Sequence, residues 1–272
     1  MAIKLIAVDL DGTLLNNESK ITKNTESVLR EAYKKGIEIV VASGRAYNAL
    51  PDQIRKLPYI NYAITSNGAF ISKLSTEECI YRDYIKEENI IFIIELAKKE
   101  NLSLEIFFNK QAYIDFETYN YIKEKGSTYR NKEYVLNTRK PIEDLFRFME
   151  ENSKYIENIN IFFKDMNKLQ KIKNWVKNMK GAQITSSFRN NIEIGGEYSS
   201  KGHALMKLGD ILNIESTDMM AFGNAENDKK MLEFVGIGVA VENAEAELKK
   251  VADKITLSND DEGVATEIEK YL

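Results

Sequence analysis

The sequence predicts an α/β fold with a doubly wound, Rossmann-like parallel sheet as its core and an inserted α+β cap domain. Short continuous apolar runs end abruptly in polar or glycine-containing loops, and helix-like stretches follow them. Continuous runs are typical of strands that are covered on both faces, as in a parallel sheet. The middle of the chain instead carries strands that are richer in aromatic residues and more nearly paired, which favours an antiparallel insert.

Five apolar runs are the expected strands of the parallel sheet, at 3–8, 37–42, 62–65, 219–222 and 237–241. Helical spacing predicts helices over 25–36 and 201–212, with Gly36 and Gly209 as stop or packing points. Ligands of open α/β folds bind outside the carboxyl ends of the strands. We therefore expect the polar loops at these ends to converge on one crevice, near residues 10, 43, 66, 201 and 225.

The insert is expected to span residues 83–195, which leaves 1–82 and 196–272 as the core. Its sequence predicts a helix over 86–101, a hairpin of 102–108 with 112–116, a helix after Pro141, a strand at 159–163, a helix around Trp175 and strands within 182–194. Short hinges near 82–85 and 194–199 are expected to join the two domains. A cap that moves over the crevice follows from this arrangement.

Composition excludes several classes of function. The chain has 272 residues, long enough for one large or two modest domains, and a formal net charge of −4, which gives no reason to expect nucleic acid or an anionic membrane as partner. Cys79 is the only cysteine, so neither a disulfide framework nor a cysteine-based zinc site is expected. No apolar run approaches the ~18 residues of a membrane span, and the first apolar run is too short for a secretory signal. We expect a cytoplasmic protein.

Asp9 and Asp11 follow the first predicted strand at positions i and i+2. Two like charges this close repel, so one carboxyl must take up a proton or a cation must lie between them. A ligand set made only of oxygen atoms favours Mg²⁺. This suggests Asp9 as nucleophile and metal ligand and Asp11 as the group that exchanges a proton. The alternative is a β-turn that begins at Asp11-Gly12.

Two further loops could bind an anion. Ser43 and Gly44 lie between a strand and a helix, where a hydroxyl and free backbone N–H groups can hold phosphate, although a serine at such a position is more often an ordinary helix cap. Lys201 opens the helix at 201–212 and could neutralise a phosphate, although a lysine there is more often solvated. Arg45 could clamp an anionic substrate or pair with a nearby carboxylate.

The stretch "GNAEND" adds oxygen-bearing side chains after the fourth strand. Asn227 could donate to phosphate, Asp228 could bind or orient the metal shell, and Asn224 could offer an amide oxygen to the cation. The alternative is an ordinary helix start, because all three residue types suit a first turn. His203 is the only histidine, which excludes a Ser-His-Asp triad. Trp175 shares helical spacing with Ile172 and Met179, which favours a place in the cap core.

Taken together, "DLDGTLL", "SGR", "SKGHAL" and "GNAENDKKML" resemble the four ordered motifs of the haloacid dehalogenase-like superfamily. The layout resembles its Cof-type phosphatases with a large α+β cap, over nearly the whole chain and including "SNGA" after the third strand. The resemblance implies that Asp9 attacks phosphorus and forms an aspartyl-phosphate. It also implies that Asp11 protonates the leaving group and then activates water.

With this resemblance, the candidate residues for phosphate or substrate binding are Leu10, Ser43, Gly44, Arg45, Lys201 and Asn227. The resemblance implies that Mg²⁺ is held by the Asp9 carboxylate, the Asp11 backbone carbonyl and residue 224, with Asp228 available to support the shell. Members of the family usually have aspartate where this chain has Asn224. An amide oxygen can still bind Mg²⁺, but the missing charge is expected to weaken metal binding.

The sequence therefore predicts a Mg²⁺-dependent phosphatase that hydrolyses small phosphorylated metabolites, such as sugar phosphates. Two alternatives remain open at this point. One is a phosphomutase that returns the phosphoryl group to a reoriented sugar. The other is a phosphate-binding protein whose turnover is weakened by Asn224. The sequence indicates neither the physiological substrate nor the oligomeric state.

Overall fold

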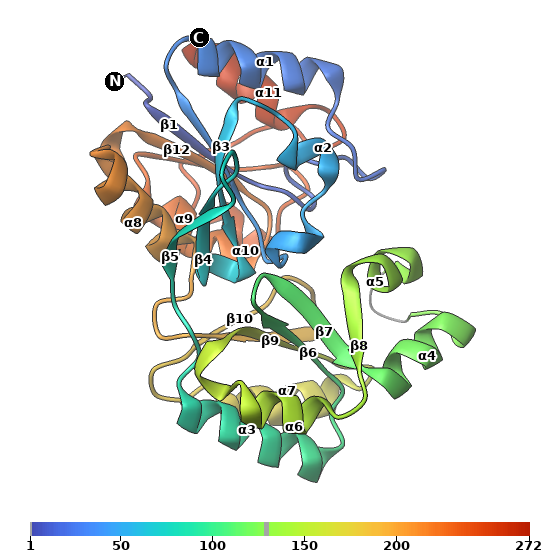
Figure 1. The fold of residues 1–272 in the computed structure, drawn as a ribbon. Helices are drawn as coiled ribbons and strands as arrows, with labels where there is room; N and C mark the ends of the chain where they lie inside the picture. The colour runs from blue at the N-terminus through green and yellow to red at the C-terminus, as the bar shows by residue number, and fades with distance from the viewer. Residues whose placement is uncertain (1, 128–130) are drawn as a thin grey trace. The chain divides into compact units, whose positions relative to one another are not determined.

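An eight-stranded sheet organises the first of two units in the computed structural model, which describes residues 2–127 and 131–272 (Figure 1). Unit 1 comprises Met1–Gly44, Leu50–Arg82 and Ser200–Leu272, and unit 2 comprises Arg45–Ala49 and Asp83–Ser199. Within the described part of the chain, no helix has both the length and the apolar composition that crossing a membrane requires.

The sheet of unit 1 has the order β14-β13-β12-β1-β2-β3-β4-β5. Its strands are β1 (Leu5–Asp9), β2 (Glu38–Ala42), β3 (Ile60–Thr65), β4 (Phe70–Lys73), β5 (Glu78–Arg82), β12 (Met219–Gly223), β13 (Ile237–Ala240) and β14 (Lys254–Ile255). Pairing is parallel from β14 to β3 and antiparallel for β4 and β5. The predicted fold class and all five predicted strands are confirmed, whereas β4, β5 and β14 were not predicted.

Helices cover both faces of this sheet (Figure 1). They are α1 (Lys23–Lys34), α2 (Asp52–Arg55), α8 (Lys201–Leu212), α9 (Lys229–Phe234), α10 (Ala246–Lys249) and α11 (Gly263–Ile268). Leu5 and Ala7 of β1 join the apolar cluster beneath α8, α9 and α10. Ile6 and Val8 alternate with them and are equally buried, so β1 is apolar on both faces, as its continuous run predicts.

The start of α8 is determined by a side-chain cap. The Ser200 hydroxyl accepts a hydrogen bond from the His203 backbone N–H, which satisfies one of the free donors of the first turn. The helix ends at Leu212, and Asn213 then adopts a left-handed conformation that few residues other than glycine and asparagine tolerate. This cap places Lys201 as the first residue of α8.

The order of the sheet positions the site. β1 lies between β12 and β2, and the chain runs outward from it to β3 on one side and to β13 and β14 on the other. Such a reversal in strand order opens a crevice at the carboxyl ends of the strands, because the connections leave in opposite directions. The loops that follow β1, β2, β3 and β12 all begin at this edge.

Unit 2 is built on a six-stranded sheet with the order β10-β11-β9-β6-β7-β8. Its strands are β6 (Leu104–Phe108), β7 (Gln111–Asp115), β8 (Arg139–Ile142), β9 (Ile156–Phe162), β10 (Gln183–Thr185) and β11 (Asn191–Gly195). Pairing is antiparallel except between β7 and β8. The expected α+β character, the hairpin and the strand near 159–163 agree with this sheet, but β8 was not predicted.

Helices α3 (Glu87–Glu100), α6 (Leu145–Glu151) and α7 (Met166–Val176) share an apolar core with the sheet, while α4 (Phe116–Lys125) and α5 (Lys132–Thr138) pack around Ile114. The prediction for Trp175 is wrong, because its side chain is 39% exposed. The buried stripe of α7 runs through Leu169, Ile172 and Val176 instead. Lys99 and Lys171 lie over the indole ring, at 5.5 and 4.7 Å from its centroid.

Candidate active site

A buried lysine joins two carboxylates at the carboxyl ends of β1 and β12 in unit 1. The Lys201 ammonium lies 2.6 Å from Oδ1 of Asp9 and 2.7 Å from Oδ1 of Asp228. Lys201 and Asp228 are fully buried, and Asp9 is 5% exposed. A lysine loses its hydration when it is buried to this extent, so it remains charged only where such partners surround it.

The loop after β12 holds Asp228 in place. Its Oδ2 accepts hydrogen bonds from the backbone N–H groups of Asn224, at 2.9 Å, and Ala225, at 3.1 Å. Its other oxygen accepts from Lys201. Both carboxylate oxygens of Asp228 are therefore engaged with groups of the protein.

Burial raises the pKa of the Asp9 carboxyl to about 7, although the Lys201 ammonium opposes the rise. Repulsion by Asp228 adds to this rise, more strongly than repulsion by Asp11. Burial alone would lower the pKa of Lys201, but attraction by Asp228 and Asp9 holds it above its ordinary value. A cation beside Asp9 would favour its ionised form, because opposite charges stabilise a carboxylate.

The raised pKa of Asp9 predicts a pH-dependent loss of stability without metal. A carboxyl whose pKa rises from 3.8 in the unfolded chain to about 7 in the folded protein contributes its full stability below the unfolded value. That contribution is lost as the pH rises toward 7. We expect the melting temperature of the wild type, relative to that of Asp9→Asn, to fall between pH 4 and pH 7.5 in EDTA. A difference in melting temperature between the wild type and Asp9→Asn that does not change with pH would contradict the raised pKa of Asp9.

Four of the other predicted residues lie in the loops that follow β1, β2 and β12. Ser43 is buried, and its backbone N–H donates to the Ile64 carbonyl. A Cβ atom added to Gly44 would lie 3.6 Å from Nδ2 of Asn227, so the loops after β2 and β12 approach each other closely. Asp11 follows the end of β1 and is exposed, where its carboxyl can exchange protons with water.

Other predicted residues have different surroundings. The Leu10 side chain is fully buried, and its carbonyl oxygen accepts from the Leu15 N–H. Arg45 groups with unit 2, where its guanidinium lies 4.7 Å from the centroid of the Tyr134 ring and donates to the Ala49 carbonyl. The structure thus brings Arg45 to Tyr134 within unit 2.

Asn67 is a residue of this site for which the sequence indicated no role. Its Oδ1 accepts a hydrogen bond of 3.0 Å from Nδ2 of Asn227, and its backbone N–H donates to the Ser43 carbonyl. The available signal was "SNG" directly after a strand, because asparagine tolerates the left-handed conformation of tight turns. That signal indicates a turn and does not identify what the turn contacts.

The residues around Asp9 fit an oxygen-liganded cation. The described hydrogen bonds of the Asp9 carboxylate use only Oδ1. Gly12 has φ of +81°, and a Cβ atom there would lie 2.5 Å from Nδ2 of Asn224, so the Asn224 amide lies against the turn that follows Asp11. Among the described residues, no three His, Cys, Asp or Glu side chains converge on a metal-sized site. One carboxylate with an amide suits Mg²⁺, which retains waters and uses substrate phosphate as a ligand.

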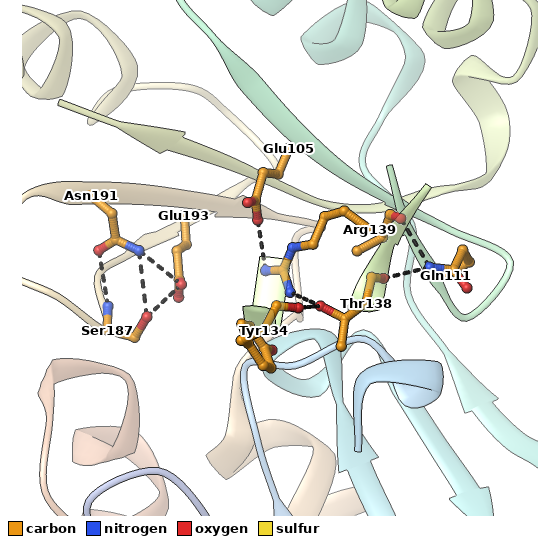
Figure 2. A network of polar contacts seen from close by, with 9 residues as sticks. Glu105, Gln111, Tyr134, Thr138, Arg139, Ser187, Asn191 and Glu193 are labelled. Carbon is orange, nitrogen blue, oxygen red and sulfur yellow. Dashed lines mark hydrogen bonds and ion pairs between the residues drawn. The ribbon is translucent and has the colours of Figure 1, made fainter. Parts of the chain in front are cut away.

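Unit 2 carries a second polar network, shown in Figure 2. Glu105 accepts from Arg139 at 2.8 Å, and both side chains are almost fully buried. Arg139 also donates to the Thr138 hydroxyl and lies 4.7 Å from the centroid of the Tyr134 ring. On strand β11, which β9 separates from β6, Glu193 accepts from the Ser187 hydroxyl and the Asn191 amide (Figure 2).

Asn160 lies between these two groups in the sheet. Strand pairing places it directly opposite Glu193 on one side and Glu105 on the other. It is fully buried, and neither atom of its amide has a hydrogen-bond partner among the described residues. Such unsatisfied amides are uncommon in proteins, because each costs about 1–3 kcal/mol. This sheet face therefore carries unused hydrogen-bonding capacity.

The chain is similar to several known proteins. A model of the haloacid dehalogenase-like hydrolase family matches residues 6–268. The phosphatase YwpJ of Bacillus subtilis is 32% identical, over 97% of this chain and 98% of its own length. The 5-amino-6-(5-phospho-D-ribitylamino)uracil phosphatase YwtE of that organism is 32% identical, over 99% and 98%. A solved haloacid dehalogenase-like hydrolase from B. subtilis has a TM-score of 0.87 at 29% identity, covering 99% of this chain and 100% of that one.

Proposed function

The chain belongs to the haloacid dehalogenase-like hydrolases, and on this basis we propose that it is a Mg²⁺-dependent phosphatase that acts through a phosphorylated Asp9. Phosphatase activity itself follows from the family and from the named phosphatases that it resembles over nearly their full length. The observation that best supports the mechanism is the Asp9–Lys201–Asp228 cluster at the carboxyl end of β1.

In the first step, an oxygen of the ionised Asp9 forms a bond to phosphorus, and the bond from phosphorus to the ester oxygen breaks. Asp11 gives its proton to that oxygen, so the leaving group departs as an alcohol. Lys201 contacts Asp9 and would lie beside the transferring group, where its charge offsets the negative charge of the phosphoryl oxygens. Ser43 and Asn227 would donate hydrogen bonds to these oxygens.

In the second step, Asp11 takes a proton from a water molecule, whose oxygen attacks phosphorus. The bond between phosphorus and Asp9 breaks, inorganic phosphate leaves and the Asp9 carboxylate is restored. Asp11 can carry out both proton transfers because it is exposed, whereas Asp9 is buried. We propose that Asp228 positions Lys201 and the loop at 224–228 in place of the metal contact expected from the sequence, since both its oxygens are engaged.

Mg²⁺ would be held by the Asp9 carboxylate, the Asp11 carbonyl and the Asn224 amide oxygen. When bound, the cation would neutralise phosphoryl charge and favour the ionised form of Asp9. Asn224 supplies an oxygen without a charge, so we expect metal affinity to be lower than for a site with two carboxylates.

Asn224→Asp tests this assignment. The added charge is expected to lower severalfold the Mg²⁺ concentration that gives half-maximal rate, measured by phosphate release across a magnesium titration. Asn213→Asp is the matched control, because it adds the same charge at an exposed position at the end of α8. An unchanged titration for Asn224→Asp, or an equal shift for Asn213→Asp, would show that residue 224 is not a ligand.

We further propose that unit 2 selects the organic part of the substrate. The polar sheet face supplies acceptors and donors for hydroxyl groups, namely the carboxylates of Glu105 and Glu193 and the unpartnered amide of Asn160. The relative YwtE is named for a substrate with a phosphorylated ribityl chain, which is rich in hydroxyl groups. A small phosphorylated polyol or sugar fits both observations.

A panel of phosphate esters, assayed with Mg²⁺ and with EDTA, tests the proposed function. We expect release of one phosphate for each ester consumed, only with Mg²⁺, and best for sugar or polyol phosphates. Formation of an isomeric sugar phosphate without free phosphate would indicate a phosphomutase instead. Absence of turnover on every ester, together with phosphate binding, would indicate a binding protein.

A further inference from the structure

The loop after β3 contacts two residues predicted for the phosphate site, Ser43 and Asn227, and the residue that precedes a third, Lys201. This loop is the short helical turn η2 (Ser66–Gly68), and its three residues are buried. Asn67 donates its backbone N–H to the Ser43 carbonyl and accepts from the Asn227 side chain. A Cβ atom at Gly68 would collide with the Ser200 carbonyl oxygen, which directly precedes Lys201.

The backbone of this loop is unusual. Ser66 and Asn67 have φ of 51° and 57°, and Gly68 has φ of 99°, so three consecutive residues have positive φ. Residues other than glycine seldom adopt such angles, and surrounding contacts must hold them there. Backbone conformations of this kind cluster at functional sites.

We infer that Asn67 is a positioning residue for phosphate binding, which acts by orienting the carboxamide of Asn227; this inference rests on the proposed phosphate site. A carboxamide has two N–H donors and one acceptor oxygen. One N–H of Asn227 donates to Asn67, which determines the direction of the second. The second N–H is then directed at phosphate. The hydrogen bond to Asn67 keeps the carboxamide from rotating, as it could in an unrestrained side chain.

Asn67 also links loops from strands that are not neighbours. β3 and β2 are adjacent, but β12 lies beyond β1 in the sheet. A Cβ atom at Gly44 would lie 3.0 Å from Oδ1 of Asn67, so this side chain fills the space between the Ser43-Gly44 loop and Asn227. Asn67 thereby keeps the phosphate-binding groups that follow β2 and β12 in one arrangement.

Asn67→Gly separates this role from a structural one. Glycine adopts the φ of Asn67 at least as readily as asparagine, so the backbone conformation is retained while the contact with Asn227 is lost. Asn213→Gly is the control, because Asn213 has nearly the same conformation, with φ of 54°, at the other end of α8 from Lys201. That end is about 18 Å from the first residue of the helix.

We expect Asn67→Gly to weaken binding of inorganic phosphate, measured by calorimetry with Mg²⁺, and to lower kcat/KM, each by about tenfold, as for one lost oriented hydrogen bond. Its melting temperature is expected to stay within about 4 °C of the wild type. Asn213→Gly is expected to change neither phosphate binding nor kcat/KM. When Asn227 is already replaced by alanine, Asn67→Gly is expected to lower phosphate affinity and kcat/KM by less than about twofold. The second substitution then has little left to remove, because the two residues act as one unit.

An equal loss in the wild-type and Asn227→Ala backgrounds, or phosphate binding as tight as that of the wild type, would overturn the inference. Binding of inorganic phosphate by the wild type distinguishes failure of the inference about Asn67 from failure of the proposed function. A wild type that binds phosphate without hydrolysing any ester refutes the phosphatase mechanism and still tests Asn67. A wild type that does neither refutes both.

Discussion

Replacement of Asp9 with asparagine is expected to reduce phosphate release by about 10³-fold or more, because the amide cannot form the covalent bond to phosphorus. The folded structure is expected to remain. Lys201 retains its contact with Asp228, and the variant loses a carboxylate that Asp228 repels. Phosphate release and melting temperature, measured on the same samples, separate the two effects.

Asp210→Asn is the matched control for this substitution. Asp210 is exposed on α8 and pairs only loosely with Lys207, at 3.8 Å, so the same chemical change there should leave turnover unchanged. If Asp9→Asn retained more than a tenth of the wild-type rate while Asp210→Asn behaved as expected, the assignment of Asp9 as nucleophile would be wrong.

Replacement of Lys201 with methionine is expected to have the largest effect on stability. It removes the only described cation that contacts Asp9 and Asp228, and it leaves two buried carboxylates without their partner. Breaking a buried ion pair in this way costs about 3–5 kcal/mol, which lowers the melting temperature by about 10 °C in a chain of this size. The loss should be larger at pH 8 than at pH 5, since Asp9 can take up a proton at the lower pH.

Lys207→Met on the same helix is the control, because the Lys207 side chain is 41% exposed, and a change there should alter stability by less than about 0.5 kcal/mol. Lys201→Met combined with Asp228→Asn should recover part of the lost stability, since it removes one of the two stranded charges. Equal melting temperatures for Lys201→Met and Lys207→Met would show that the ion pairs do not stabilise the fold.

The core strands and the ends of α8 could be predicted from the sequence because their signals are local. A continuous apolar run leaves few alternatives to a buried strand, and Ser200 and Asn213 are typical residues for the start and end of a helix. The β4–β5 hairpin escaped prediction because its strands are short and β5 is only partly buried. The prediction for Trp175 was wrong because helical spacing identifies the buried stripe of a helix but does not show which residues beside that stripe also face the core.

The sequence predicted that the loops carrying Asp9, Lys201 and Asp228 converge, but it did not indicate which of their side chains are in contact. Lysine at the start of a helix is ordinarily solvated, and Lys201 is buried because Asp9 and Asp228 arrive from loops that are distant in sequence. The same separation in sequence hid the contact between Asn67 and Asn227. Side-chain pairings between separate loops depend on the order of the strands, which no single stretch of the sequence encodes.

The stereochemistry at phosphorus tests the central claim most directly. A phosphate ester made chiral with three oxygen isotopes, hydrolysed by the wild type with Mg²⁺, reports how many displacements occur. Each in-line displacement inverts the phosphorus centre, so transfer to Asp9 followed by transfer to water gives net retention of configuration. Retention is the result that a phosphorylated Asp9 predicts, and inversion would show that water attacks the ester directly.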